Sequence, residues 1–316
     1  MSASCRSTPF CRRVYLGALE CTMLGVALTG CATTEPGPPE SRIVFRGFGP
    51  EAVDLYSVRP DGMDLRQLTR DVANEDSPTW SRDGRQIAYA AQVAEDSRRD
   101  IYIINADGSG RRRLTSTGAT NENPEWSPDG SRIAFDSWAG PGPVAEGNRV
   151  WVMQANGSGR ISLAPGVTPS WSPDSRRLVF RGLIGSGPRS GLAIISSDGT
   201  GEFQLTDPGA SVDDLYPEWS PDGNFIAFTR VVHGSPGTWH AGVWLIQPDG
   251  TGLKQLTAPL IQAYQPTWSP DGTEIVFSDG DNGQLKGIRP EDPATIRFLG
   301  TRSDLYYDAP AWGPER

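Results

Sequence analysis

Few side chains in this sequence could carry out catalysis. The two histidines, His233 and His240, fall within one short segment, and all four cysteines lie at or before Cys31. The sequence contains neither a Gly-x-Ser-x-Gly nucleophile motif nor a His-Glu-x-x-His metal motif. A Ser-His-Asp arrangement would need one of these two histidines as its base. We therefore expect a protein that is not an enzyme.

Carboxylates and aromatic side chains gather instead in segments between apolar stretches. Aromatic side chains anchor interfaces well, and segments of varied length often carry recognition. The candidate binding residues are Glu75, Asp76, Glu122, Trp138, Asp213, Asp214, Tyr216, His233, Trp239, His240, Tyr264, Tyr306, Tyr307 and Asp308. The alternative is sequence drift without a partner. We expect no cofactor and no metal, with a divalent cation among these carboxylates as the alternative left open.

The N-terminus resembles an export signal. Arg6, Arg12 and Arg13 precede a short apolar stretch at 21–30, which is too short to span a bilayer as a helix. The tetrad Leu-Thr-Gly-Cys that ends at Cys31 resembles a bacterial lipobox, and a Pro-rich segment follows it. We expect a lipoprotein signal peptide at 1–31, a lipid on Cys31 and a linker at 32–41. An ordinary secretory signal is the alternative.

Composition limits the fold class. The chain has 316 residues, 38 acidic against 29 basic, for a formal net charge of -9. Nucleic-acid binding draws on clustered basic residues, so we expect no nucleic-acid partner. The 37 glycines and 27 prolines leave little room for long helices. A mostly β protein is therefore favoured.

An internal repeat organises the chain after the linker. The pattern Trp-Ser-Pro-Asp-Gly, or a close variant, recurs at intervals of about 44 to 49 residues. Its tryptophans are Trp80, Trp126, Trp171, Trp219, Trp268 and Trp312. Each of the first five is followed by an alternating apolar stretch, a second such stretch, a turn and a short third stretch. The turns are Asp-Gly or Asn-Gly pairs such as Asp107-Gly108, except after Trp268, where Glu291-Asp292-Pro293 takes this place. Each unit predicts a four-stranded antiparallel meander, as in a β-propeller blade.

The two ends of the repeat region complement each other. The first unit, at 42–45, lacks a preceding tryptophan strand, while the chain ends in a spare one at 310–312. Pairing of these segments would complete a ring and remove its exposed seam. We predict an all-β, six-bladed β-propeller over 42–316. Pro-Asp-Gly is typical of turns, so we interpret the repeated aspartates as structural.

The repeat Trp-Ser-Pro-Asp-Gly-x-x-Ile-Ala-Phe, followed by Asp-Gly and Leu-Thr, resembles the repeat of the TolB family of propellers. That family implies a non-enzymatic binding platform in the periplasm. Two departures stand out: TolB proteins carry a separate α/β domain before the propeller, and they lack a lipobox. The resemblance therefore implies fold, export and a binding mode, but not membership of the Tol complex.

These expectations combine into one hypothesis. The chain would be a monomeric scaffold, held on the periplasmic side of the cell envelope by its lipid alone, that binds an envelope protein or a cell-wall component. Ala32 follows the lipid site, which resembles sorting to the outer rather than the inner membrane. The alternative is a glycan-binding or glycan-cleaving propeller, because similar repeats occur in oligogalacturonate lyases. Those enzymes use channel histidines and a metal, which the histidines here match poorly.

Overall fold

The structure is a computed structural model. It describes residues 41–48, 52–70, 73–92, 98–138, 147–182, 191–235, 237–259, 261–299 and 306–314. The expected signal peptide, the lipid site at Cys31 and nearly all of the linker lie outside the described residues. Within the described part, no helix is both long and apolar enough to cross a membrane.

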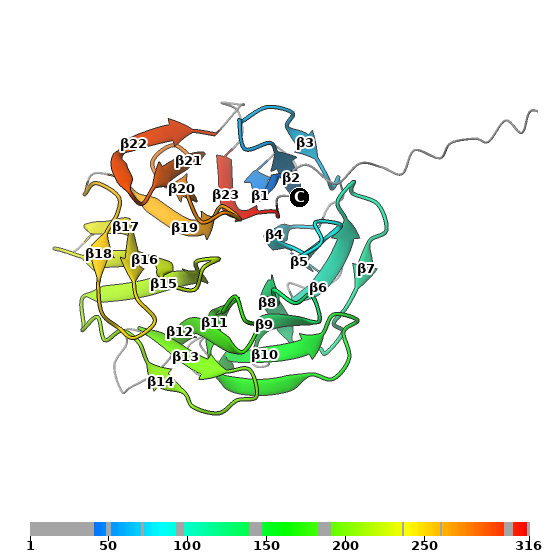
Figure 1. Ribbon diagram of the computed structural model, residues 1–316. Helices are drawn as coiled ribbons and strands as arrows, with labels where there is room; N and C mark the ends of the chain where they lie inside the picture. Colours follow the sequence, from blue (N-terminus) through cyan, green and yellow to red (C-terminus); the bar gives the residue numbers. More distant parts are fainter. Residues whose placement is uncertain are drawn as a thin grey trace, which may run out of the picture. The chain divides into compact units, whose positions relative to one another are not determined.

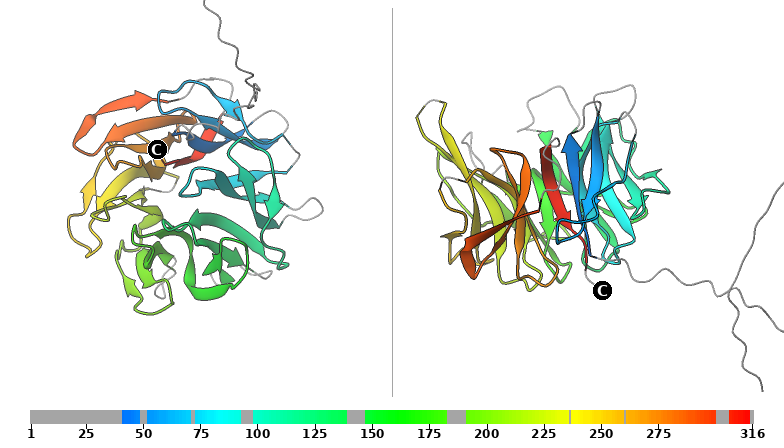
Figure 2. Two further views of the ribbon diagram at one scale, coloured as in Figure 1. Left: turned by 45° about the vertical axis from the view of Figure 1, so that its right-hand side comes forward. Right: turned by 90° about the horizontal axis from the view of Figure 1, so that it is seen from above.

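The first sheet joins the two ends of the repeat region. Its order is β23-β1-β2-β3, formed by Tyr306–Trp312, Ile43–Phe48, Val53–Val58 and Arg66–Gln67. β23 pairs antiparallel with β1, so that Ile43 lies opposite Trp312 and Gly47 opposite Tyr307. In both views of Figure 2 the red β23 lies beside the blue β1.

The next unit along the chain forms its own four-stranded sheet. β4 (Glu75–Trp80), β5 (Gln86–Gln92), β6 (Arg99–Asn105) and β7 (Arg112–Arg113) follow one another in sequence and in space. Two later sheets repeat this order. They are β15 (Val212–Trp219), β16 (Ile226–His233), β17 (Trp239–Ile246) and β18 (Lys254–Gln255), then β19 (Ala263–Trp268), β20 (Ile275–Asp279), β21 (Gln284–Arg289) and β22 (Asp292–Phe298).

The remaining sheet has seven strands. It runs from β8 (Thr120–Trp126) through β9 (Arg132–Trp138), β10 (Arg149–Gln154), β11 (Ile161–Trp171), β12 (Arg177–Gly182) and β13 (Leu192–Ser196) to β14 (Phe203–Gln204). β11 pairs with β10 through its first half and with β12 through its second half. One long strand therefore connects two repeat units.

The strands that end in the repeated tryptophans surround a common centre (Figure 1). β4 packs against β8, β8 against β11, β11 against β15, β15 against β19, β19 against β23, and β23 against β4. These inner strands form a closed cycle of neighbours. The described part of the chain is thus an all-β propeller of antiparallel sheets.

The apolar second strands explain how the sheets pack, because they are buried on both faces. Each unit places one large aromatic side chain at the same position of its second strand, and all are at most 1% exposed: Phe45, Tyr89, Phe135, Phe180, Phe228 and Phe277. Burial of such a side chain contributes about 1.5 to 3 kcal/mol. The core clusters combine residues of adjacent units, as where Phe135 packs with Ile101 and Ala88. The core therefore lies between the sheets.

The repeated turns have a structural role, as their composition indicates. Ser127 Oγ donates to Asp129 Oδ1 at 2.7 Å, and Gly130 has a φ of 75°, which suits glycine. The tryptophans connect neighbouring units: Trp171 Nε1 donates to the carbonyl oxygen of Glu125 at 3.1 Å, and Arg132 lies over the Trp171 ring at 4.6 Å. These groups hold adjacent inner strands together.

Candidate binding face around the central channel

Every inner strand contains the same backbone irregularity. Six residues, each directly before the proline of a Pro-x-Trp segment, have φ between 47° and 51°: Ser77, Asn123, Thr168, Tyr216, Gln265 and Ala309. The pairing register shifts at these positions, for example between Asp76 and Thr79. A left-handed conformation at residues other than glycine costs about 1 to 3 kcal/mol. The bulge is therefore held by its surroundings, and it directs side chains towards the channel.

These six residues and the prolines after them line a cavity of about 110 Å³ between the inner strands. These six backbone positions are equivalent, but their side chains differ, so the side chains that line the cavity are not arranged symmetrically. Serine, asparagine, threonine, tyrosine and glutamine present hydroxyl and amide groups, which form directional hydrogen bonds. A lining of this kind can discriminate between partners.

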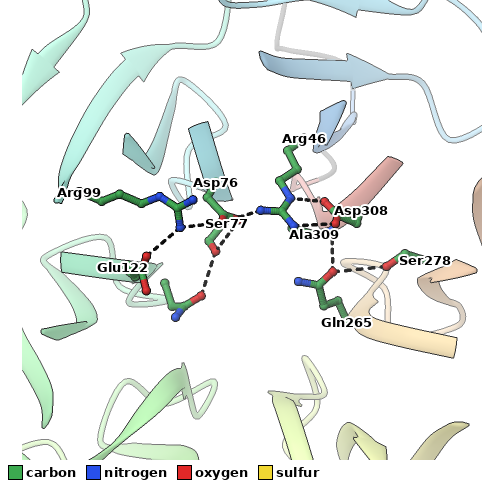
Figure 3. A network of polar contacts seen from close by, with 10 residues as sticks. Arg46, Asp76, Ser77, Arg99, Glu122, Gln265, Ser278, Asp308 and Ala309 are labelled. Atoms are coloured by element: carbon green, nitrogen blue, oxygen red, sulfur yellow. Dashed lines mark hydrogen bonds and ion pairs between the residues drawn. The ribbon is translucent and has the colours of Figure 1, made fainter. Parts of the chain in front are cut away.

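Charged side chains next to this lining form a continuous network, shown in Figure 3. We call Arg46, Asp76, Arg99, Glu122 and Asp308 the channel-mouth network. Arg46 pairs with both oxygens of Asp308 and, at 2.6 Å, with Asp76. Arg99 Nη1 lies 3.0 Å from Asp76 and 2.7 Å from Glu122. Positive and negative groups alternate from β23 and β1 through β4 and β6 to β8, so the network connects successive inner strands.

Two amide side chains continue the network. Ser77 Oγ donates to Asn123 Oδ1 at 2.9 Å, and Gln265 Oε1 accepts from the backbone N–H of Ala309 at 2.9 Å. Ser278 Oγ lies 3.4 Å from the same Gln265 oxygen. Ser77 Oγ also lies 3.2 Å from Asp76 Oδ1, so the left-handed Ser77 and Asn123 join the charged network directly.

A polar cavity of about 280 Å³ opens beside the network. Its walls include Arg46, Asp76, Glu122, Asp136, Arg181 and Tyr216. Burial raises the pKa of Asp136 to about 7, although hydrogen bonds from the Thr168 N–H and Asn123 Nδ2 oppose this shift. Burial also raises the pKa of Tyr216. The cavity offers cationic, anionic and neutral polar groups within a small volume.

A second polar cluster lies at the start of β15. Asp213 Oδ2 is 2.8 Å from His233 Nε2, while Asp214 receives two hydrogen bonds from Arg230, at 2.7 and 2.8 Å. Asp214 is fully buried, so its pairing with Arg230 stabilises the blade. His240 Nε2 is buried without a hydrogen-bond partner among the described residues.

Two exposed aromatic pairs border the same face. The rings of Trp239 and Tyr264 meet edge to face at 5.9 Å, and those of Phe48 and Tyr306 do so at 5.5 Å. Trp239 is 48% exposed and Tyr306 is 42% exposed. Trp138, at the end of β9, packs its ring against Gly147, where an added Cβ would lie 2.8 Å from the ring.

Three candidate residues are not available to a partner, which corrects the sequence-based set. Glu75 and Tyr307 are 1% exposed and Asp214 is 0% exposed. Tyr307 points into the core, where its ring meets that of Phe45 at 4.9 Å. Successive side chains of a strand point to opposite faces, so only one of the adjacent tyrosines on β23 can face outwards, and it is Tyr306.

Two channel residues were missed by the sequence analysis. Glu125 and Glu218 occupy the middle position of Pro-x-Trp, where the other repeats have threonine, serine or alanine. Both line a cavity of about 340 Å³ together with tryptophans of the repeat. Burial raises the pKa of Glu125 to about 7, and burial together with the charge of Glu125 raises that of Glu218 to about 8. The Pro-Glu-Trp variant of the motif was the signal that could have found them.

Comparison with known proteins agrees with this fold. The model of the Tricorn protease N-terminal beta propeller domain matches residues 37–187. The Tol-Pal system protein TolB of Desulfosudis oleivorans is 37% identical over 59 residues, which are 19% of this chain and only 14% of that relative. The curated match is therefore confined to a short part of the relative.

Solved structures extend the likeness over the propeller. TolB from Acinetobacter baumannii has a TM-score of 0.71 and 21% identity, covering 90% of this chain and 69% of its own. A putative TolB from Agrobacterium tumefaciens has a TM-score of 0.63 and 18% identity, covering 87% of this chain and 100% of its own. The repeats, the cycle of inner strands and these comparisons together show that the described part of the chain has a β-propeller fold similar to that of TolB proteins.

Proposed function

We propose that this protein is a lipid-anchored, six-bladed propeller of the cell envelope that binds another envelope protein, or a cell-wall component, at its channel-mouth face. The protein neither cleaves nor transforms what it binds. The lipid on Cys31 would hold it on the periplasmic side, at the outer rather than the inner membrane, and one copy would suffice for binding. Resemblance to TolB proteins supports an envelope scaffold.

The count of six blades follows from the repeats. The seven-stranded sheet holds two of the tryptophan units, and β11 changes partner at its middle, so the sheet counts as two blades. The pairing of β23 with β1 supplies the inner strand that the first unit lacks. We infer a ring in which the last strand completes the first blade.

The observation that carries the function is the contrast between the two faces. One face bears the short turns, in which each motif aspartate bonds to its own turn, as Asp129 does to Ser127 and Ser131. The other bears the channel-mouth network, the polar cavity and the exposed pairs Trp239–Tyr264 and Phe48–Tyr306. Side chains that are exposed, aromatic and rigidly packed at one rim are suited to binding a partner.

The double variant Trp239→Ala with Tyr306→Ala tests this assignment. We expect unchanged folding, because neither ring belongs to the buried core, and at least tenfold weaker capture of a crosslinked envelope partner from cell extract. Met63→Ala, which truncates a 64% exposed side chain in a turn of the opposite face, is the matched control. Equal capture by all three proteins would contradict the choice of face. Retention on an oligosaccharide array without protein capture would favour the glycan-binding alternative.

A further inference from the structure

The contacts between successive blades differ in charge. We define the first seam as Asp54 on β2, Gln67 on β3, Thr69 in the loop after β3, Glu75 on β4 and Tyr89 on β5. The second seam is the same set one repeat later: Asp100, Arg113, Thr115, Asn121 and Phe135. Their shared backbone contact supports the correspondence: Thr69 Oγ1 accepts from the Leu55 N–H at 2.9 Å, and Thr115 Oγ1 accepts from the Ile101 N–H at 2.9 Å.

The second seam balances its buried carboxylate internally. Asp100 is 2% exposed and pairs with Arg113. It also accepts from Thr115 Oγ1 at 2.6 Å and from Asn121 Nδ2 at 3.0 Å. One negative charge thus meets one positive charge and two neutral donors, as a buried carboxylate requires.

The first seam changes three of these residues together. Glutamine (Gln67) replaces the arginine, glutamate (Glu75) replaces the asparagine, and tyrosine (Tyr89) replaces the phenylalanine. Asp54 is 7% exposed and Glu75 is 1% exposed, so two carboxylates are buried, and no ion pair like that of the second seam joins them to another described residue. Burial raises the pKa of Asp54, and the positive charge of the exposed Arg70 only partly opposes this shift.

Three oxygens of the first seam have no hydrogen-bond partner among the described residues: Asp54 Oδ1, Glu75 Oε1 and the Tyr89 hydroxyl. The other oxygens are satisfied, because Asp54 Oδ2 accepts from Gln67 Nε2 at 2.8 Å and Glu75 Oε2 accepts from Thr69 Oγ1. Glu75 Oε2 also accepts from the Leu55 N–H at 3.3 Å, which holds Glu75 beside the backbone next to Asp54. Burial raises the pKa of both Tyr89 and Glu75; the charge of Glu75 raises the pKa of Tyr89 further, and that of Asp54 raises the pKa of Glu75 further. Tyr89 is 0% exposed, and its matched residue Phe135 packs without a hydroxyl, so packing does not explain the hydroxyl.

We propose that the first seam binds a hard cation through Asp54, Glu75 and the hydroxyl of Tyr89. Carboxylate and neutral oxygens are the ligands that Ca²⁺ takes in proteins, and the cation would supply the positive charge that Arg113 supplies in the second seam. A proton on Glu75 would satisfy one of the three oxygens and leave the other two unpaired, whereas a cation contacts all three. Within the described residues no three His, Cys, Asp or Glu side chains gather as metal ligands, so the site depends on two carboxylates and a hydroxyl.

Thermal unfolding of the purified full-length protein tests the proposal. Increasing CaCl2 at pH 7.5 should raise Tm by several degrees in a saturable manner, since a ligand that binds only the folded state stabilises it. At pH 5.5 protons should compete for Glu75, and more CaCl2 should be needed for the same rise. Parallel titrations with MgCl2 and NaCl define the preferred ion.

The matched control installs the second seam in the first: Gln67→Arg, Glu75→Asn and Tyr89→Phe together. This variant should fold with a Tm that CaCl2 does not change. Tyr89→Phe alone should require at least tenfold more CaCl2 for the same rise in Tm. Glu122→Gln, at the channel mouth, should respond as the unsubstituted protein does. Equal responses of the seam variant and the unsubstituted protein would overturn the proposal. So would a Tm that depends on pH but on none of the three salts, which would assign the site to a proton.

Discussion

Replacement of Arg46 by alanine should destabilise the protein by about 2 to 4 kcal/mol at pH 7, since loss of one partner leaves buried charge uncompensated. Arg46 is the only described side chain that pairs with both Asp76 and Asp308, whose side chains are 15% and 14% exposed. Burial already raises the pKa of Asp308, and the hydrogen bond from Arg46 opposes that shift. Without Arg46, the pKa of Asp308 should rise further.

The sign of the pH dependence follows from that change. A carboxyl group whose pKa is higher in the folded than in the unfolded state makes the protein less stable as pH rises. The destabilisation by Arg46→Ala should therefore be smaller at pH 4.5 than at pH 7. Arg99→Ala is the control: Asp76 keeps Arg46, and we expect a loss below about 1 kcal/mol. Urea unfolding of both variants at the two pH values measures this, and equal losses for both would contradict the central role of Arg46.

Replacement of Glu218 by glutamine should stabilise the protein by about 4 to 5 kcal/mol at pH 8.5 and by less than about 1 kcal/mol at pH 5. The pKa of Glu218 is raised to about 8 in the folded protein, above the ordinary value of 4.5 that the unfolded chain retains. Between these values the unfolded chain releases the proton and the folded protein keeps it, so stability falls as pH rises from about 4.5 to about 8. Glutamine is neutral at every pH, so the variant does not lose this stability as pH rises.

The hydrogen bonds of Glu218 support the choice of glutamine. Oε1 accepts from Thr267 Oγ1 at 3.1 Å and from the Trp268 N–H at 3.0 Å, and the amide oxygen of glutamine can accept both. Asp222→Asn, in the turn that follows, is the control. Burial raises the pKa of Asp222, but hydrogen bonds from Ser220 and Asn224 lower it below its ordinary value. The charged carboxylate therefore stabilises the folded protein, and Asp222→Asn should be less stable at both pH values. A Glu218→Gln variant that is equally stabilised at pH 5 and pH 8.5 would show that ionisation is not the cause.

The spacing of the tryptophans predicted the propeller because each repeat contains the strand and turn signals of one antiparallel meander. Continuous apolar runs mark strands such as β5 and β16, which are buried on both faces, and Asp-Gly or Asn-Gly pairs set the turns. The spare strand at the C-terminus predicted the pairing partner of β1. These signals are local or periodic, so a single sequence contains them.

The binding face was less predictable, since its geometry depends on residues distant in sequence. Asp76 and Asp308 come together only because Arg46 lies between them in the ring, and nothing in their local sequence indicates that contact. Tyr306 and Tyr307 are the same residue type, and only the register of β23 with β1 decides which of them is buried. Glu75 appeared equivalent to its neighbour Asp76, but strand alternation buries the one and leaves the other at the channel.

Photocrosslinking in intact cells is the most direct test of the binding face. A photoreactive amino acid at position 306 or 239 should form an adduct of one defined mass with an envelope component. The same amino acid at position 63, in a turn of the opposite face, should form none. Adducts from position 63 with none from positions 306 and 239 would contradict this assignment of the binding face.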